Sequence, residues 1–545
     1  MTHFVNDIGQ VISESIDGYL RVSGGGLLAR LTSSTGAKIV VRQGIDANKV
    51  SLISGGGSGH EPAHVGFVGQ GMLTAAVCGE IFASPSVEAV LTAIRHVTGP
   101  AGCLLIVKNY AGDRLNFGLA AEKARAEGLH VAMVIVGDDI AIENAQRPRG
   151  VAGTLFVHKV AGYAAERGLG LAAVKAAAEK AAASVQSIGI ATTVCTIPGR
   201  ATHDRLPDGM AELGLGIHGE PGIERILLPS ASEAARLMTA KFGAGPHTSA
   251  GYAMIINNLG GVPAIEMSLL ANAILDTEIG RKTQYVIGPA PLMTALDMRG
   301  FSISILGLDG DLTDALLAPT TAPAWPGVKA IAPIWRVAAN DRPQAAGYAA
   351  SQRPETRRAV EGVAKAIIGA EAELNLLDAK VGDGDTGTTM AGAARNVLGA
   401  IDTLPFADNA QLCGALADTF AKSMGGSSGV LLSILSAATG HALAAGSPWP
   451  VALAAGLDRM EYYGGAREGD RTMLDALRPA VRALADGKGL SGAAAAAGDG
   501  AAKTATMTSA RAGRSSYLAA RDLEGVPDPG AVAMAKAFRA LVETG

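Results

Sequence analysis

Three carboxylates set among glycines form the strongest candidate site in this sequence. Asp378, Asp383 and Asp385 lie at positions i, i+5 and i+7, and glycines alternate with the last two. Because glycine lets the backbone fold tightly, these non-adjacent carboxylates can converge on one point. Clustered anions repel one another unless a cation lies between them, and hard oxygen ligands suit Mg²⁺, which kinases also bind through phosphate oxygens. The pattern predicts a magnesium site that serves a phosphorylated ligand.

Two alternatives fit part of the same pattern. Asp-Gly is a common turn dipeptide, so the stretch could be a plain surface turn. An EF-hand would bind calcium, but it needs a further acidic ligand late in its loop, and residues 388–394 contain none. Three acids packed with glycines at a predicted helix end favour the magnesium interpretation.

Two more glycine clusters, 424–429 and 513–516, precede helix-forming sequence. Free backbone N–H groups at a helix start can hold phosphate oxygens, although glycine-serine loops are also common connectors. Arg471 could neutralise negative charge on a transferring phosphoryl group, or it could be a solvated arginine at a helix start. The residues alone leave both questions open.

The first half of the chain offers polar residues that follow predicted strands or lie in glycine-rich loops. They are His60 after the turn 54–59, Lys108 and Asp113 at and after the strand 103–107, and His218 in the loop 214–222. The turn lacks the Lys-Ser/Thr ending of a P-loop and is not G-x-G-x-x-G, so a small hydroxylated ligand fits better than a nucleotide. Each histidine alone is more often structural than catalytic. Polar loops converging from one sheet would form a site, because α/β proteins bind ligands at strand ends.

A folded scaffold must position these residues, and the sequence predicts two domains with different secondary structure. Up to about residue 330, short β-branched runs alternate with alanine-rich amphipathic stretches, which predicts an α/β fold. The pattern changes near residue 190, after a long helical stretch. We therefore expect an α/β domain over 1–332, with subdomains of about 1–188 and 189–332.

Residues 333–354 carry three prolines without apolar periodicity, which predicts a linker. Beyond it β-branched runs nearly vanish, and alanine- and leucine-rich segments show three-to-four spacing. We expect an all-α helical bundle or barrel over 355–545. The carboxylates and both glycine clusters belong to this second domain, which makes it the candidate nucleotide-binding domain.

Composition excludes several classes of protein. The 545 residues are 48% hydrophobic with a net charge of −4, which gives no electrostatic footprint for nucleic acid or an anionic membrane. We see no signal-peptide pattern and no apolar run long enough to span a membrane without a charge or turn signal. The four cysteines lack C-x-x-C spacing and predict buried, reduced thiols. We expect a cytoplasmic protein without a membrane or nucleic-acid partner.

Several long motifs resemble the dihydroxyacetone kinase family across essentially the whole chain. In the first half these are SGGGSGHEPAHVGFVGQGMLTAAVCGEIFASPS at 54–86, VKNYAGD at 107–113 and GLGIHGEPG at 214–222. In the second half they are LNLLDAKVGDGDTGTTM at 374–390, MGGSSGVLL at 424–432, GDRTMLDAL at 469–477 and DPGA at 528–531. The serine pairs at 427–428 and 515–516 depart slightly from the family pattern.

The resemblance implies that His218 attacks the ketone carbon and holds the substrate as a covalent hemiaminal. It implies that Gly57, His60, Lys108 and Asp113 bind the substrate hydroxyls, with His60 and Asp113 as acid/base candidates. Such a bond selects short ketones and aldehydes over glycerol, which has no carbonyl group.

For the nucleotide, the resemblance implies ATP as co-substrate and two Mg²⁺ ions on Asp378, Asp383 and Asp385. The residues that would surround the nucleotide are Thr386, Gly387, Gly425, Gly426, Ser427, Ser428, Arg471, Met473, Gly513, Asp528, Pro529 and Gly530. Both domains on one chain favour the branch of the family that uses ATP over the branch that uses a phosphotransfer protein. Members with this fusion form homodimers in which the nucleotide domain of one chain serves the sugar domain of the other.

Three alternatives remain beside the main prediction of an ATP-dependent dihydroxyacetone kinase. The same chemistry could act on glyceraldehyde, erythrulose or a branched ketose such as apulose, because pocket size sets that choice. A second function class in the family is a lyase that cyclises a flavin dinucleotide with Mn²⁺ and does not need His218. A third is a non-catalytic ketose sensor, against which the intact aspartates argue.

Overall fold

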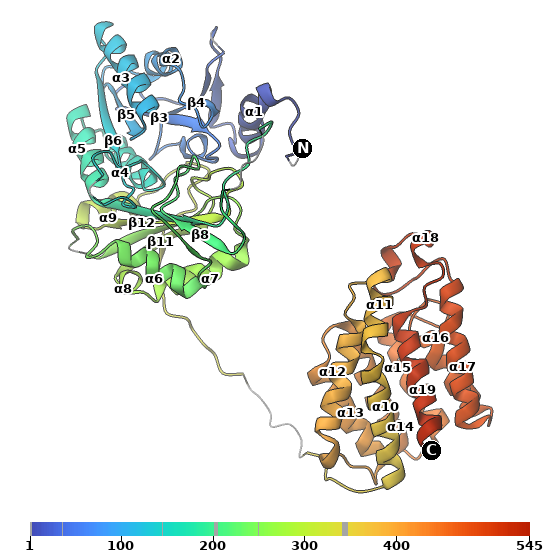
Figure 1. The fold of residues 1–545 in the computed structure, drawn as a ribbon. Coiled ribbons are helices and arrows are strands. Elements are labelled where there is room, and N and C mark those ends of the chain that lie inside the picture. Colours follow the sequence, from blue (N-terminus) through green and yellow to red (C-terminus); the bar gives the residue numbers. More distant parts are fainter. Residues whose placement is uncertain (1–2, 35, 144, 201–204, 249, 340–346) are drawn as a thin grey trace. The chain divides into compact units, whose positions relative to one another are not determined.

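The computed structural model describes residues 3–545 except 35, 144, 201–204, 249 and 340–346. The chain divides into two compact units, Met1–Arg336 and Val337–Gly545 (Figure 1). This division falls inside the segment 333–354 that the sequence assigns to a linker. The first unit is mixed α/β and the second is helical, which confirms the predicted fold class.

The first sheet of the α/β unit carries most of the predicted substrate residues. Its strand order is β1-β2-β4-β3-β5-β6, and the last four strands in this order are parallel. Parallel neighbours end at the same edge of a sheet, so the loops that follow β3 and β5 lie close together. The strands are β1 (Leu28–Leu31), β2 (Lys38–Arg42), β3 (Ser51–Ser58), β4 (Ala75–Ile81), β5 (Cys103–Lys108) and β6 (Val131–Val136).

Helices cover both faces of this sheet, and alternate residues of β5 show it. Leu104 and Ile106 pack in one core with α4, whereas Leu105 and Val107 pack in another with α2 and α3. A parallel sheet covered on both sides has fully buried strands, as β3 and β5 are here. The helices of this part are α1 (Val11–Ser23), α2 (Val87–Val97), α3 (Ala111–Ala126), α4 (Thr154–Glu166) and α5 (Leu171–Ala183).

A second, mostly antiparallel sheet has the order β13-β11-β10-β12-β7-β8-β9. Its strands are β7 (Val185–Ala191), β8 (Met210–Leu213), β9 (Glu224–Leu227), β10 (Tyr252–Asn258), β11 (Thr283–Ala290), β12 (Gly300–Gly307) and β13 (Lys329–Ala330). Its helices are α6 (Ala231–Lys241), α7 (Ala264–Leu275), α8 (Glu278–Arg281) and α9 (Gly310–Leu317). The expected subdomain boundary at 188/189 falls inside β7, which pairs with β12 along its whole length.

The second unit consists of helices, most of which are joined by short connections. They are α10 (Pro354–Gly369), α11 (Glu371–Val381), α12 (Thr386–Gly399), α13 (Asn409–Ser423), α14 (Gly426–Ala444), α15 (Trp449–Gly464), α16 (Leu474–Ala485), α17 (Gly489–Lys503), α18 (Ala520–Leu523) and α19 (Pro529–Thr544). Pro354 and Pro529 stand in the first turns of α10 and α19, where proline's missing N–H costs no hydrogen bond. An apolar cavity of about 820 Å³ lies inside this unit.

Helix α14 bears on the expectation that the chain has no membrane-spanning segment. Its window Ser427–Ala444 has a mean hydropathy of 1.3, so by length and composition alone this helix could cross a membrane. Leu432, Leu435 and Ser436 of α14 line the apolar cavity. Only 17% of this window is buried inside the unit, so most of the helix keeps some exposed surface.

Candidate active site

Two histidines from distant parts of the chain meet in the α/β unit. His60, just after β3, is completely buried, and its Nε2 lies 3.0 Å from Nε2 of His218. Nδ1 of His60 lies 2.7 Å from the carbonyl oxygen of Thr294, and Nδ1 of His218 lies 3.0 Å from Oε1 of Glu220. Burial, and next the charge of Lys108, hold the pKa of His60 well below its usual range. Each ring is thus oriented by an acceptor on its far nitrogen.

Lys108 and Asp113 belong to the same buried group. Lys108 ends β5 and Asp113 lies in the first turn of α3, and their side chains are 0% and 3% exposed. A Cβ placed on Gly56 would come 3.3 Å from Oδ2 of Asp113 and 3.6 Å from Nζ of Lys108. Burial raises the pKa of Asp113, and the charge of Lys108 opposes that shift. The structure therefore brings His60, Lys108, Asp113 and His218 together.

Position 57, beside this group, has no room for a residue larger than glycine. A Cβ there would come 2.7 Å from the backbone nitrogen of Ala83 and 2.8 Å from Cα of Phe82. Only glycine fits such close contact with the neighbouring backbone. Gly57 is thus placed where the sequence predicts a substrate contact, and the contact itself stays a prediction.

Several residues of this cluster were missed from the sequence. The rings of Phe82 and Tyr110 pack against His218 with centroids 5.2 and 4.5 Å away. The hydrogen bond from His218, against the opposite effect of burial, holds the pKa of Glu220 at about 2. Glu220 stands two residues from His218 in the same motif, so proximity to a histidine could have identified it. Thr294 is distant in sequence, and no local signal points to its carbonyl oxygen.

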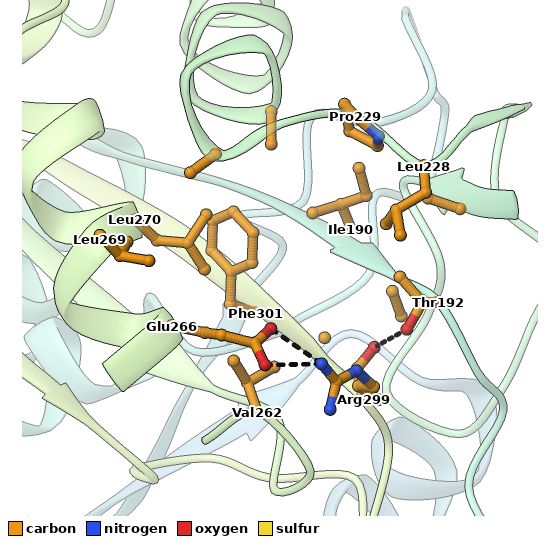
Figure 2. Close-up of a pocket in the computed structure, with 15 residues that line it drawn as sticks. Ile190, Thr192, Leu228, Pro229, Val262, Glu266, Leu269, Leu270, Arg299 and Phe301 are labelled. Carbon is orange, nitrogen blue, oxygen red and sulfur yellow. Dashed lines mark hydrogen bonds and ion pairs between the residues drawn. The ribbon is translucent and has the colours of Figure 1, made fainter. Parts of the chain in front are cut away.

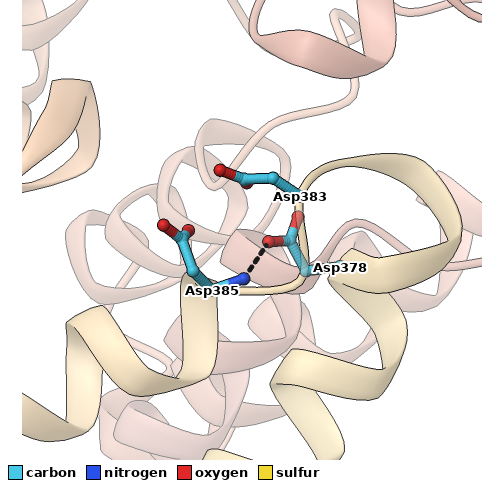
Figure 3. Close-up of side chains that lie close together, drawn as sticks. All are labelled: Asp378, Asp383 and Asp385. Atoms are coloured by element: carbon cyan, nitrogen blue, oxygen red, sulfur yellow. Dashed lines mark hydrogen bonds between the residues drawn. The ribbon is translucent and has the colours of Figure 1, made fainter. Parts of the chain in front are cut away.

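The three aspartates of the helical unit also converge, as Figure 3 shows. One ligand oxygen from each of Asp378, Asp383 and Asp385 lies within 4.8 Å of the others. Oδ2 of Asp378 accepts a hydrogen bond from the backbone nitrogen of Asp385 at 2.9 Å (Figure 3). It accepts a second from the backbone nitrogen of Thr386 at 3.1 Å, and the two bonds fix this carboxylate. Asp385 precedes α12 but its side chain does not cap the helix, which leaves the carboxylate available to a metal ion. Exposed oxygen ligands beside one fixed carboxylate fit Mg²⁺ with its waters and phosphate oxygens.

A cationic side chain reaches this carboxylate group. Arg514 forms an ion pair with Asp383 through Nη1 and Oδ2. Arg514 follows Gly513, whose φ of 71° is left-handed and whose missing Cβ faces open space. The segment 513–516, one of the two predicted phosphate loops, therefore lies next to the predicted metal ligands.

Arg471 lies in the interior of the helical unit, and Asp528 nearby is partly buried. Arg471 is 0% exposed, so the alternative of a solvated arginine is wrong. Its Nη2 donates to the carbonyl oxygen of Val526 at 2.6 Å, which joins the loop 469–473 to the turn before α19. Asp528 caps α19 by accepting from the nitrogen of Ala531 at 2.7 Å, and burial raises its pKa to about 6.

The remaining predicted nucleotide residues lie at helix starts. Thr386 and Gly387 begin α12, Gly425 caps α14, whose first residues are Gly426, Ser427 and Ser428, and Pro529 and Gly530 begin α19. Met473 is 9% exposed, and its side chain lies against Gly530. Their contact with a nucleotide stays a prediction.

A separate apolar pocket of about 280 Å³ lies in the second sheet's part of the α/β unit (Figure 2). Leu228, Leu270 and Phe301 are among its walls. Nη2 of Arg299 lies 2.7 and 2.8 Å from the two carboxylate oxygens of Glu266 beside it (Figure 2). Its described lining includes none of the predicted substrate residues.

Comparison with known proteins gives matches over both units. Residues 27–324 match the Dak1 domain, and residues 380–543 match the DAK2 domain. The chain is 47% identical to dihydroxyacetone kinase of Citrobacter freundii, over 99% of each chain. It is 42% identical to a putative 3,4-dihydroxy-2-butanone kinase of Solanum lycopersicum, over 98% of this chain and 97% of the relative. It is 40% identical to human triokinase/FMN cyclase, over 93% of this chain and 94% of the relative.

A solved structure is similar along the whole chain. The dihydroxyacetone kinase of C. freundii in complex with AMP-PNP and Mg²⁺ superposes with a TM-score of 0.80 at 45% identity, and the match covers 100% of both chains. That protein binds an ATP analogue and magnesium. The fold that holds the paired histidines and the three aspartates is therefore shared with it.

Proposed function

This chain belongs to the dihydroxyacetone kinase family, and on that premise we propose that it transfers the terminal phosphoryl group of ATP to a terminal hydroxyl of dihydroxyacetone. The observation that carries the proposal is the contact between buried His60 and partly exposed His218, beside Lys108 and Asp113. An ATP-dependent kinase is the enzyme class that the family matches support.

His218 is the proposed covalent anchor for the ketone. Nε2 of His218 passes its proton to Nε2 of His60 and attacks the carbonyl carbon. A C–N bond forms as the C=O π bond breaks, and the oxygen takes that proton to become the hydroxyl of a hemiaminal. The Glu220 carboxylate at Nδ1 favours positive charge on the ring while that bond forms. Phe82 and Tyr110 pack against the same ring and restrict its orientation.

The hydroxyl that receives phosphate must lose a proton. Asp113 and His60 are the candidate bases, and the lowered pKa of His60 keeps that ring neutral and able to accept one. The Lys108 ammonium would hydrogen-bond the same substrate and stabilise negative charge on its oxygen.

Asp378, Asp383 and Asp385 would hold magnesium for the nucleotide, and we propose two ions. When bound, magnesium neutralises the phosphate charge and bridges phosphate oxygens. The protein's own part is to fix Asp378 through the backbone of Asp385 and Thr386, while Arg514 pairs with Asp383 until a metal ion replaces it. The glycine-rich helix starts of α12 and α14 and the segment 513–516 would contact the phosphates.

A coupled ADP-release assay tests the proposal. Mg·ATP is supplied with dihydroxyacetone, glyceraldehyde, erythrulose, apulose or glycerol, using wild type and His218→Ala. We expect turnover on dihydroxyacetone, none on glycerol, and loss in the variant, together with loss of the dihydroxyacetone adduct in native mass spectrometry. Turnover on glycerol, or full activity of His218→Ala, would refute the covalent mechanism.

Two relatives favour specific alternatives. The tomato relative is named for a four-carbon ketose, so preference for erythrulose in the same assay would keep the mechanism and change the substrate. The human relative is named triokinase/FMN cyclase, so the helical unit could also cyclise a flavin dinucleotide with Mn²⁺. His218→Ala would spare such a lyase and Asp383→Ala would abolish it.

We also propose a homodimer, formed through the outer strand of the second sheet. β9 ends that sheet, and Leu227 and Leu228 at its end are 78% and 59% exposed. Leu228 also borders the apolar pocket of Figure 2, as does Leu269 of α7, which is 58% exposed. Among the described residues β9 pairs only with β8, and an exposed apolar patch beside such a sheet edge is typical of a protein interface. Light scattering should give a dimer for wild type and a monomer for Leu227→Asp/Leu269→Asp. A dimer is expected for the control Leu119→Asp, and a dimeric double variant would refute this interface.

A further inference from the structure

A second pair of histidines lies in the interior of the α/β unit, and the proposed chemistry gives it no role. His64, in the loop after β3, is 3% exposed, and His158 on α4 is 0% exposed. Their rings meet edge to face, with centroids 5.2 Å apart. The two residues come from segments more than ninety positions apart, so the tertiary fold alone creates the pair.

Lys108 faces this pair. Side chains alternate along a strand, and Leu104 and Ile106 of β5 pack in the core that includes α4, so Lys108 points to the same face. Helix α4 packs against β5 and β3. Electrostatics agrees, because after burial the charge of Lys108 is the largest influence on the pKa of both His64 and His158.

The polar atoms of this group have no hydrogen-bond partner among the described residues. They are Nδ1 and Nε2 of His64 and of His158, Nζ of Lys108 and Oγ1 of Thr154. Buried polar groups in native proteins are nearly always hydrogen-bonded, to protein or to ordered water. A group this rich in donors and acceptors is a suitable site for bridging water.

We propose that His64 and His158 are positioning residues that hold the Lys108 ammonium in place for the ketose substrate. This role rests on the proposed kinase function, because it assigns Lys108 to the substrate hydroxyl. The two rings would accept hydrogen bonds from the ammonium, through ordered water, on the α4 side of the sheet.

Donor and acceptor counts support this role. An ammonium has three donors and no acceptor, and a neutral imidazole offers one acceptor nitrogen. Burial and the charge of Lys108 keep both rings neutral, and the pKa of His158 falls to about 3. Asp113, on α3, belongs to the helix that covers the opposite face. Lys108 would thus have the Asp113 carboxylate near it at the sheet edge and neutral acceptors toward α4.

Other charged and polar groups near the edge of the sheet influence the charge of Lys108. They are Asp113 on α3, Glu220 after β8, Asp138 after β6, Glu61 and His60 after β3, and the ring of Tyr110, whose centroid lies 5.8 Å from Nζ. Burial lowers the pKa of Lys108 and the carboxylates raise it. Removing acceptors from the ammonium therefore shifts the balance toward the neutral amine.

Apolar and polar replacements of His158 test the role. In His158→Phe we expect the high-pH limb of kcat/KM for dihydroxyacetone to move to lower pH by about one unit, because Lys108 loses its proton more easily. His158→Asn, which keeps a polar side chain, should restore much of the limb. His64→Leu should shift the high-pH limb in the same direction, and His64→Gln should restore much of it. These two variants serve as the test if His158→Phe does not fold. Lys159→Met, a buried neighbour on α4 that bonds Ala315, is the control and should lower the melting temperature without moving the limb.

Calorimetric binding of dihydroxyacetone without ATP, measured across the same pH range, separates this inference from the proposed function. Binding by wild type with an acid-shifted loss in the apolar variants supports the positioning role. Unchanged pH profiles in folded apolar variants, or equal shifts in the apolar and polar variants, would overturn it while the kinase function stands. No ketose binding by wild type would remove the proposed function and this role together.

Discussion

Nε2 of His60 and Nε2 of His218 lie 3.0 Å apart, although each ring's Nδ1 already faces an acceptor. The Thr294 carbonyl oxygen can only accept, so Nδ1 of His60 carries a proton, and the Glu220 carboxylate requires the same of His218. Two neutral rings would then oppose lone pairs at Nε2. A hydrogen bond between the two Nε2 atoms therefore needs one further proton. Nε2 of His218 must be without it to attack a carbonyl, and Nε2 of His60 is the adjacent acceptor.

Replacing Glu220 should impair the covalent step. Glu220→Gln removes the charge that fixes Nδ1–H of His218, so we expect kcat/KM for dihydroxyacetone to fall by ~10- to 100-fold. The pKa of Glu220 is held at about 2, so its carboxylate is charged throughout the neutral range and the loss should not depend on pH there. Steady-state kinetics measures this, with exposed Glu224→Gln as the control. Equal activity of the two variants would contradict the orienting role.

Acid should destabilise the α/β unit partly through His158. Burial and the charge of Lys108 lower the pKa of His158 from 6.5 to about 3. Between these values the unfolded chain binds the proton and the folded chain does not, so stability rises with pH. The free energy of unfolding should therefore fall by about 1.4 kcal/mol for each pH unit of acidification across that range from this residue.

Urea unfolding of wild type and His158→Asn between pH 3 and 7 measures the effect. The variant should show a shallower dependence on pH, because it lacks the group that gains a proton on unfolding. A steeper dependence in the variant would contradict the assignment.

Arg514 should compete with metal for Asp383. The two side chains form an ion pair, and a guanidinium beside a carboxylate opposes binding of a cation there. In Arg514→Ala we expect Mn²⁺, used as a paramagnetic probe without nucleotide, to bind a few-fold more tightly. Asp383→Asn should weaken it, and Arg511→Ala on the same segment is the control. Weaker metal binding in Arg514→Ala would show that Arg514 does not compete.

Gly387 should be essential to the carboxylate loop for steric reasons. A Cβ there would come 2.1 Å from the carbonyl oxygen of Glu371 and 2.7 Å from Oδ1 of Asn375. Gly387→Ala must therefore shift α11 against α12, and we expect loss of metal binding and about 1–3 kcal/mol of stability.

Gly392→Ala on the same helix is the matched control, since a Cβ there meets nothing within 4 Å. Alanine is the better helix former, so this change should stabilise the unit by up to about 1 kcal/mol. Thermal unfolding and Mn²⁺ titration of both variants measure the difference. Equal behaviour of the two would contradict the steric argument.

The sequence by itself determined the secondary-structure class of the two units and the local motifs. β-Branched runs against alanine-rich periodicity separated the α/β part from the helical part, because these patterns follow from local backbone preference and burial. The carboxylates at i, i+5 and i+7 were readable as one site, since a glycine-rich loop brings them together within a few residues. The predicted subdomain boundary at 188/189 falls inside β7. The sequence near residue 188 does not show this, because β7 pairs with β12, which lies more than a hundred residues later.

Only the tertiary structure decided which polar residues meet across long separations. Hydrogen bonding of His60 to Thr294, contact of His64 with His158, and burial of Arg471 each depend on packing between distant segments. Local pattern carries no information about such contacts, because the free energy that fixes them comes from burial in a shared core. The protonation states that the proposed chemistry needs are consequences of that burial, and they follow from the fold and not from the motifs.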